Sequence, residues 1–234
     1  MGSSLSIIGD HSVPFNKSHL IDTYAILEKL NSLELDNSEF LNEMCIKWHT
    51  DNAHLNTDIG SKEKSELERC LELKEWKILY IDDFDFLTDS ISYELEGPYG
   101  LILELNKYYF EFSIWMGRFF QWFIREDDEN ILWREKWRQI IYKITSVLGG
   151  NYVLYFPDSN YDLSYYWPRN FSFPQGMETE LKCSLKNLDQ AVDAISKLYA
   201  NPTTLTEADK IFDRDNETPF VVDRFEDLDK TLEL

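Results

Sequence analysis

The chain has 234 residues and a formal net charge of −20, with 43% hydrophobic and 15% aromatic residues. Enough apolar side chains are present to build a packed core, which excludes a globally disordered chain. Strong negative charge repels nucleic acid and anionic membranes, so we expect neither as a partner, and it attracts basic proteins. The alternative is that the acidity serves only to keep the protein soluble.

Three cysteines, Cys45, Cys70 and Cys183, are far apart in the chain, odd in number and without a Cys-x-x-Cys motif. This pattern favours free thiols in a reducing compartment over a disulfide framework. No apolar run approaches the roughly 20 residues of a membrane-spanning helix. The first residues lack the basic and apolar regions of a signal peptide. We therefore expect a cytoplasmic protein.

The N-terminal third is predicted to be mainly helical after one short strand at Leu5–Ile8. Ser18 is the expected N-cap of a helix over about residues 19–31. Four apolar residues recur there at helical spacing and define the expected buried face: Leu20, Tyr24, Leu27 and Leu30. Ser38 is the expected cap of a second helix. The charged stretch from Ser61 to Trp76 is expected to be a solvated helix or a helix that turns into a strand.

The middle of the chain predicts a three-stranded β-meander over residues 91–114, preceded by a strand at Trp76–Ile81. Apolar and polar residues alternate in the meander between Gly, Pro and Asn turn residues, which is typical of antiparallel strands with one buried face. An aromatic patch, Trp115–Trp122, follows. We expect this patch to pack in the core, with an exposed interaction surface as the alternative.

The second half continues with an amphipathic helix over about residues 129–148, which Gly149-Gly150 ends. A buried strand is predicted at residues 152–156. A further helix is expected over about residues 188–199, beginning after a capping asparagine.

The acidic C-terminal segment, about residues 205–234, is expected to add a short helix and strand or to dock loosely. No linker and no internal repeat divides the chain. Residues 1–234 are therefore predicted to form one α+β domain, in which amphipathic helices pack on a mostly antiparallel sheet.

No phosphate-binding glycine loop and no Gly-x-Ser-x-Gly nucleophile motif is present. The strongest catalytic candidate is Pro157-Asp158 followed by Glu180-Leu-Lys182, which resembles the Pro-Asp…Asp/Glu-x-Lys pattern of a large nuclease superfamily. The resemblance implies that Asp158 and Glu180 hold Mg²⁺ while Lys182 steadies the attacking water or the transition state. Net negative charge opposes DNA binding, because phosphate neutralisation normally supplies much of the affinity. We therefore expect no catalytic residue and keep the nuclease as an alternative.

A metal site is not expected from the sequence either. Cys45 and His49 are four residues apart and would share one face of a helix, but no second pair of ligands with matching spacing accompanies them. His49 is therefore interpreted as an ordinary hydrogen-bonding residue at a helix end, and no cofactor is expected.

The clearest surface feature is the stretch from Asp82 to Glu96, which holds six acidic residues and no Lys or Arg. Charged residues at a sheet edge commonly block aggregation between strands. The alternative is a binding surface for a basic protein. The predicted partner-binding set combines four aspartates of this stretch with three aromatic anchors of a later loop: Asp82, Asp83, Asp85, Asp89, Tyr165, Tyr166 and Trp167.

Two stretches in the middle third of the chain carry a resemblance to a known class of proteins. They are Gly97-Pro-Tyr-Gly-Leu101 and Tyr152-Val-Leu-Tyr-Phe-Pro-Asp158, with the aromatic patch and the amphipathic helix between them. In these features the chain resembles small bacterial immunity proteins of polymorphic toxin systems. The resemblance implies a single-domain, acidic, non-catalytic protein of the cytoplasm that covers the active site of a cognate toxin, expected here to be a basic domain.

Three functions follow from these observations. An immunity-type inhibitor that binds and neutralises a cognate toxin is the leading hypothesis. A Mg²⁺-dependent nuclease is the first alternative, and a structural or assembly subunit is the second. The oligomeric state is not predicted.

Overall fold

The computed structural model of the chain describes residues 5–18, 20–51, 61–85, 90–113, 128–157 and 221–229. The described helices are α1 (Thr23–Asn31), α2 (Glu39–Asp51), α3 (Ser61–Glu72) and α5 (Asp128–Val147), with short 3₁₀ turns η1 (Leu35–Asn37) and η3 (Pro98–Gly100). The described strands are β1 (Leu5–Gly9), β2 (Lys77–Asp85), β3 (Ser90–Glu96), β4 (Ile102–Leu105), β5 (Phe110–Ser113), β6 (Val153–Pro157) and β7 (Val221–Asp223). None of the helices described combines the length and the apolar character that crossing a membrane requires.

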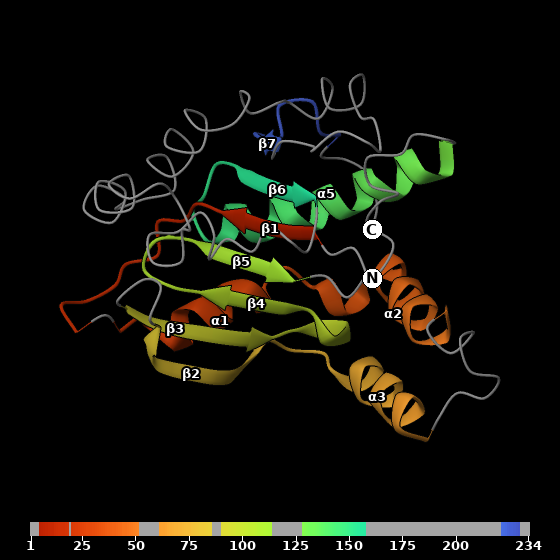
Figure 1. The fold of residues 1–234 in the computed structure, drawn as a ribbon, viewed down its shortest axis with the longest axis horizontal. Helices are drawn as coiled ribbons and strands as arrows, with labels where there is room; N and C mark the ends of the chain where they lie inside the picture. Colours follow the sequence, from red (N-terminus) through yellow and green to blue (C-terminus); the bar gives the residue numbers. More distant parts are fainter. Residues whose placement is uncertain are drawn as a thin grey trace, which may run out of the picture.

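The described strands form one antiparallel sheet of seven strands in the order β2-β3-β4-β5-β1-β6-β7 (Figure 1). β2 to β5 pair in succession, which confirms the predicted meander and the strand before it. β1 inserts between β5 and β6 and pairs with both. Together with the helices, this sheet confirms the predicted α+β fold class.

One face of the sheet is apolar and forms part of the core. Across five neighbouring strands, one register row consists of side chains with at most 1% of their surface exposed: Leu95, Leu103, Phe112, Ile7 and Tyr155. Helices α1 and α5 lie against this face, and their buried residues form one cluster with it (Figure 1). Because side chains alternate along a strand, the residues between these core positions point to the opposite face.

Helix α5 confirms the predicted amphipathic helix and its end. The helix stops at Val147, and Gly149 follows with a φ of 76°, a conformation that favours glycine. The Gly149 N–H donates to the Ser146 carbonyl at 3.0 Å, and the Gly150 N–H donates to the Thr145 carbonyl at 2.9 Å. These two bonds form the Schellman arrangement and satisfy carbonyls that the helix leaves unpaired.

The predicted start of the first helix is wrong. The helix begins at Thr23, and Asp22, not Ser18, is its N-cap. Ser18 belongs to a preceding turn, in which Asn16 Oδ1 accepts hydrogen bonds from the N–H groups of Ser18 and Leu20 at 2.8 and 3.0 Å. Such side-chain bonds to nearby backbone groups compete with helix formation, so the helix starts only after this turn.

The expected buried face of α1 is wrong at two of its four positions. Leu20 precedes the helix and is 44% exposed, and Tyr24 is 76% exposed. Leu30 is buried as predicted, together with Ile26 one helical turn before it, and Leu27 packs against the core as predicted. Leu20 is exposed because it precedes the helix and is therefore not part of the helical repeat.

The second helix and the helix-to-strand transition are confirmed. Ser38 Oγ accepts a hydrogen bond from the first turn of α2 at 3.1 Å. α3 leads into β2, which continues past the predicted strand 76–81 to Asp85. The aromatic patch at 115–122 and the helix expected over 188–199 lie outside the described residues.

Residues 221–229 are tied to the sheet and to α5 by a buried ion pair. β7 pairs with β6. Arg138 of α5, 2% exposed, donates two hydrogen bonds to the carboxylate of Asp223, at 2.7 and 2.9 Å. The Tyr155 hydroxyl donates to the same carboxylate at 3.0 Å. This part of the acidic C-terminal segment is therefore held by charge as well as by strand pairing.

Replacing Asp223 by alanine should lower the free energy of unfolding by about 1–3 kcal/mol, because Arg138 Nε and the buried Tyr155 hydroxyl lose their acceptor. Glu135 and Asp227 still compensate the charge of Arg138. Urea unfolding followed by tryptophan fluorescence measures this change. Lys17→Ala, which removes an exposed cation, is the control and should change stability by less than about 0.5 kcal/mol. Equal effects of the two substitutions would contradict the buried-pair account.

A partly buried polar contact closes the loop after β1. His11 Nε2 lies 2.8 Å from the Asn106 carbonyl oxygen, and His11 Nδ1 accepts from the Val13 N–H at 3.1 Å. The imidazole is therefore neutral, with its proton on Nε2. Burial lowers the pKa of His11 below 6.5, against the opposing effects of the Asn106 hydrogen bond and the nearby Asp10.

Stability should consequently fall as the medium is acidified. The unfolded chain binds a proton at His11 more readily than the folded chain, so this contribution is complete above the unfolded pKa of about 6.5 and is lost as the pH falls below it. His11→Gln keeps a donor for Asn106 and should show a shallower decline in urea unfolding between about pH 7 and pH 5. Unchanged slopes for the two proteins would contradict this role of His11.

Candidate functional site

Strand β2 presents an exposed apolar edge. It is the outermost of the described strands on its side of the sheet, so one edge of its backbone faces no described strand. Three consecutive side chains on it, Leu79, Tyr80 and Ile81, are 50%, 60% and 41% exposed. An edge of this kind offers backbone N–H and C=O groups and apolar surface to another chain. This is the feature that most clearly indicates protein binding.

The register of β2 changes within this edge. Ile78 pairs with Leu95, but Tyr80 pairs with Glu94, so two residues of β2 span one step of β3 around Leu79. A bulge of this kind bends the strand and re-aims its side chains. Tyr80 consequently shares the register row of Glu94.

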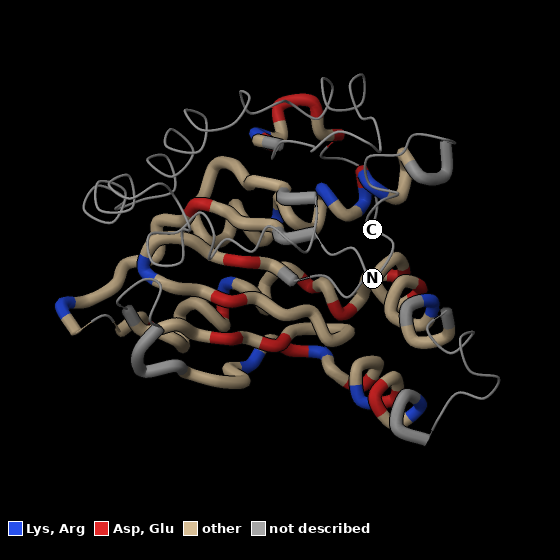
Figure 2. The backbone as a smooth tube through the Cα atoms, in the orientation of Figure 1, with Lys and Arg blue, Asp and Glu red and all other residues tan. Residues whose placement is uncertain are grey.

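Three glutamates continue this row across the sheet. Glu94, Glu104 and Glu111 stand directly opposite one another on β3, β4 and β5, and each is partly exposed. Figure 2 shows these acidic positions following one another across neighbouring strands. We call these three residues the glutamate row. It lies on the face opposite the core, because its members alternate with the buried apolar residues.

The row gathers negative charge at an energetic cost. Like charges directly opposite each other on paired strands are destabilising. The middle member, Glu104, accepts a hydrogen bond from the Ser92 hydroxyl at 2.6 Å. The arrangement therefore holds one carboxylate in place between two others and forms an acidic surface next to the exposed Tyr80.

The residues predicted for partner binding are only partly described. Asp82, Asp83 and Asp85 are residues of β2, and Asp82 is opposite Ser92 in the register. Asp89 lies outside the described residues. The same holds for the three aromatic anchors and for the alternative nuclease residues: Tyr165, Tyr166, Trp167, Asp158, Glu180 and Lys182. Both sets stay predictions.

The glutamate row was not among the predicted site residues. Each glutamate is a single polar residue in an alternating strand, which predicts only that it points away from the core. The alignment of all three depends on the register of two hairpins. That register is set by the turns between Glu96 and Ile102 and between Leu105 and Phe110. The lengths of these two turns are the sequence feature from which the alignment could have been predicted.

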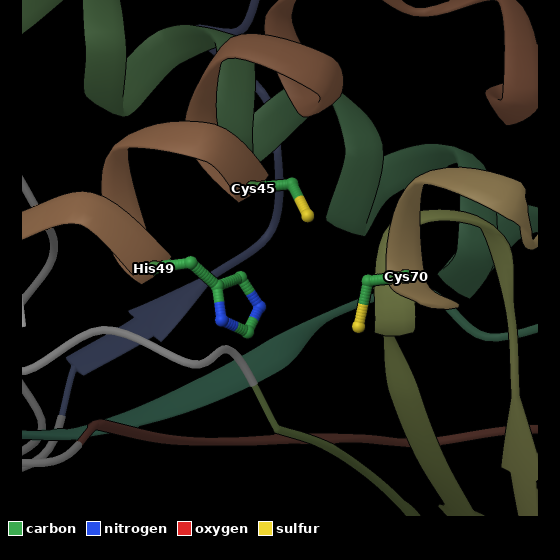
Figure 3. A group of neighbouring side chains, drawn as sticks. All are labelled: Cys45, His49 and Cys70. Atoms are coloured by element: carbon green, nitrogen blue, oxygen red, sulfur yellow. The ribbon is translucent and has the colours of Figure 1, made fainter. Parts of the chain in front are cut away.

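The structure also brings together three side chains that can bind a metal. Figure 3 shows Cys45 and His49 of α2 and Cys70 of α3 pointing into one space between the two helices. One ligand atom of each lies within 4.8 Å of the other two. All three residues are buried, with 8%, 7% and 0% of their surface exposed. We call them the Cys–His–Cys cluster.

Charged groups surround the thiol of Cys70. Arg69 Nη2 lies 3.9 Å from Cys70 Sγ, and Glu66 Oε1 lies 4.0 Å from the same atom. A hydrogen bond from Cys45 lowers the pKa of the Cys70 thiol, and the positive charge of Arg69 adds to this, while burial opposes it. The same shared hydrogen bond, together with burial, raises the pKa of Cys45.

The backbone of η3 covers the cluster from another side. A Cβ at Gly100 would lie 2.7 Å from Cys70 Sγ, and Gly100 has a φ of 76°. Both the contact and the conformation require glycine at this position. The Gly97-Pro-Tyr-Gly-Leu101 stretch thus lets the chain approach the thiol closely.

No protein family model matches the chain, and no curated protein or solved structure is significantly similar to it.

Glu94→Lys should raise the free energy of unfolding by about 0.2–1 kcal/mol at low salt, because it turns the like-charged pair of Glu94 and Glu104 into an opposite-charged one. Urea unfolding measures the change. Glu43→Lys makes the same charge change on the exposed side of α2 and should leave stability within about 0.5 kcal/mol. A loss of stability in Glu94→Lys would contradict repulsion within the row.

Proposed function

We propose that the protein is a non-catalytic binding protein that engages a basic protein partner through the edge of β2 and the glutamate row. The observation that carries this proposal is the exposed apolar run Leu79-Tyr80-Ile81 on a sheet edge, directly beside three carboxylates in register.

The edge supplies the affinity in this proposal. A partner segment that lies along β2 gains backbone hydrogen bonds to the outer side of the strand, which is the mode of recognition by strand addition. Tyr80, 60% exposed, offers an aromatic anchor with a polar end. Aromatic side chains at the centre of an interface commonly contribute more than their neighbours do.

Charge supplies the selectivity and the rate of association. The net charge of −20 steers a basic partner toward the chain over distances of about the Debye length. A lysine or arginine laid across the glutamate row meets carboxylates from three strands, and its charge offsets their mutual repulsion. An acidic partner would be repelled at the same place.

The particular form of this function is an immunity-type inhibitor that neutralises a cognate toxin, as the resemblance of Gly97–Leu101 and Tyr152–Asp158 implies. A cytoplasmic location is part of the proposal and is supported by the buried free thiols of Cys45 and Cys70.

Two substitutions test the surface against a partner isolated with the full-length chain. Tyr80→Ala should raise the dissociation rate constant and weaken binding by about tenfold or more, because an anchor is lost. Glu94→Lys should slow association and reduce the dependence of the dissociation constant on salt. Biolayer interferometry over a series of salt concentrations measures both effects.

Glu43→Lys is the matched control, because it changes the net charge equally on the core-side helix α2. If Glu43→Lys and Glu94→Lys weaken binding equally, net charge and not this surface governs recognition. If neither Tyr80→Ala nor Glu94→Lys affects binding, the proposed face is wrong. Self-association of the purified chain that Tyr80→Ala abolishes would instead favour the structural-subunit alternative.

A further inference from the structure

The Cys–His–Cys cluster lies apart from the proposed binding surface, and neither the fold nor that function accounts for it. Three buried side chains with metal-binding atoms converge from two helices that are consecutive in the described chain. We propose that Cys45, His49 and Cys70 bind one Zn²⁺ ion, which clamps α2 to α3.

The positions of the three ligand atoms suit three of the four positions of a tetrahedral ion. With Zn–S distances of about 2.3 Å and Zn–N distances of about 2.0–2.1 Å, the ligands of one zinc are about 3.5–3.8 Å apart. The three atoms here already lie within 4.8 Å of one another, so small side-chain rotations bring them to that spacing. Cys45 and His49 are one turn apart on α2 and therefore project from the same helix face.

The donor set selects the metal. Two thiolates and one imidazole are soft and borderline ligands, which favour Zn²⁺, whereas Mg²⁺ and Ca²⁺ require oxygen ligands. Two thiolates also neutralise the double charge of the ion. A neutral centre fits a site whose three residues are each at least nine-tenths buried, because an uncompensated buried charge is strongly unfavourable.

Arg69 and Glu66 support the site as positioning residues. Arg69 makes hydrogen bonds of 2.6 to 3.2 Å to Glu66, which hold that carboxylate near Cys70. The guanidinium itself approaches Cys70 Sγ at 3.9 Å and favours the thiolate form. Groups of this kind around a metal ligand orient it and adjust its basicity.

A reversible disulfide between Cys45 and Cys70 is the competing use of the same atoms. A disulfide needs only the two sulfurs, at about 2.05 Å from each other. It gives no role to His49, which is buried and directed into the same space (Figure 3). A metal would use all three groups, so His49 separates the two chemistries in an experiment.

The first test uses the full-length chain, purified with a thiol reductant, stripped of metal with a chelator and then titrated with Zn²⁺ or Co²⁺. We expect one bound ion per chain by elemental analysis and a higher melting temperature in the metal-bound form. Co²⁺ should also produce the charge-transfer absorption of a cobalt–thiolate centre. A folded chain that binds neither ion at micromolar concentration would overturn the proposal.

Substitutions then assign the ligands. Cys45→Ser, Cys70→Ser and His49→Gln should each weaken Zn²⁺ binding by more than about 100-fold, and Glu66→Gln by about 10- to 100-fold. His11→Gln is the matched control and should bind the metal as the unaltered chain does. Circular dichroism of each variant shows whether it folds; where a variant is unfolded, the cobalt spectrum of the unaltered chain decides.

The disulfide alternative has a different outcome. The cluster is a redox pair if no metal binds and mild oxidation removes two hydrogens per chain. A peptide map should then show Cys45 linked to Cys70, and the oxidation should proceed equally in His49→Gln. Failure of metal binding leaves the proposed protein-binding surface untouched, because Tyr80 and the glutamate row belong to a different part of the fold.

Discussion

The pairing of β1 on both of its edges is the interaction on which the rest of the structure depends. β1 joins the meander β2–β5 to the pair β6–β7, which would otherwise be two separate sheets. Ile7 and Ile8 point to opposite faces, and both are fully buried. Gly9 completes the fit, because a Cβ there would lie 2.1 Å from the ring of Phe110 on the neighbouring strand. The first of the described strands is thus an interior strand, paired on both of its edges.

The strand register of this sheet determines which residues lie on each of its two faces. Alternation places Leu95, Leu103 and Phe112 in the core and the glutamate row on the other side. A shift of the register by one residue would bury the carboxylates, so the burial of the core face also determines where the acidic surface lies. The cost of three aligned carboxylates is small compared with the burial of that core row, and the fold tolerates it.

The helices α2 and α3 connect the second site to the same sheet. Arg69 of α3, beside the Cys–His–Cys cluster, forms a 2.6 Å ion pair with Glu96 at the end of β3, and Lys77 of β2 lies 3.1 Å from the same residue. α3 leads directly into β2, so residues 61–85 contain both a cluster cysteine and the exposed edge. The glycines of the η3 turn make this junction compact, since Gly97 packs against Trp76 and Gly100 against Cys70.

What the sequence by itself determined was local. The meander, the Ser38 cap and the end of α5 at Gly149 depend on alternation, one capping hydroxyl and one glycine, and each was predicted from neighbouring residues. The predicted start of α1 was wrong because Asn16 forms a competing turn within the same few residues. The tertiary structure alone decided the place of β1 between β5 and β6, the alignment of Glu94, Glu104 and Glu111, and the approach of Cys70 to Cys45 and His49. These depend on strand order, hairpin register and helix packing, in which residues far apart in the chain meet for reasons that no local pattern records.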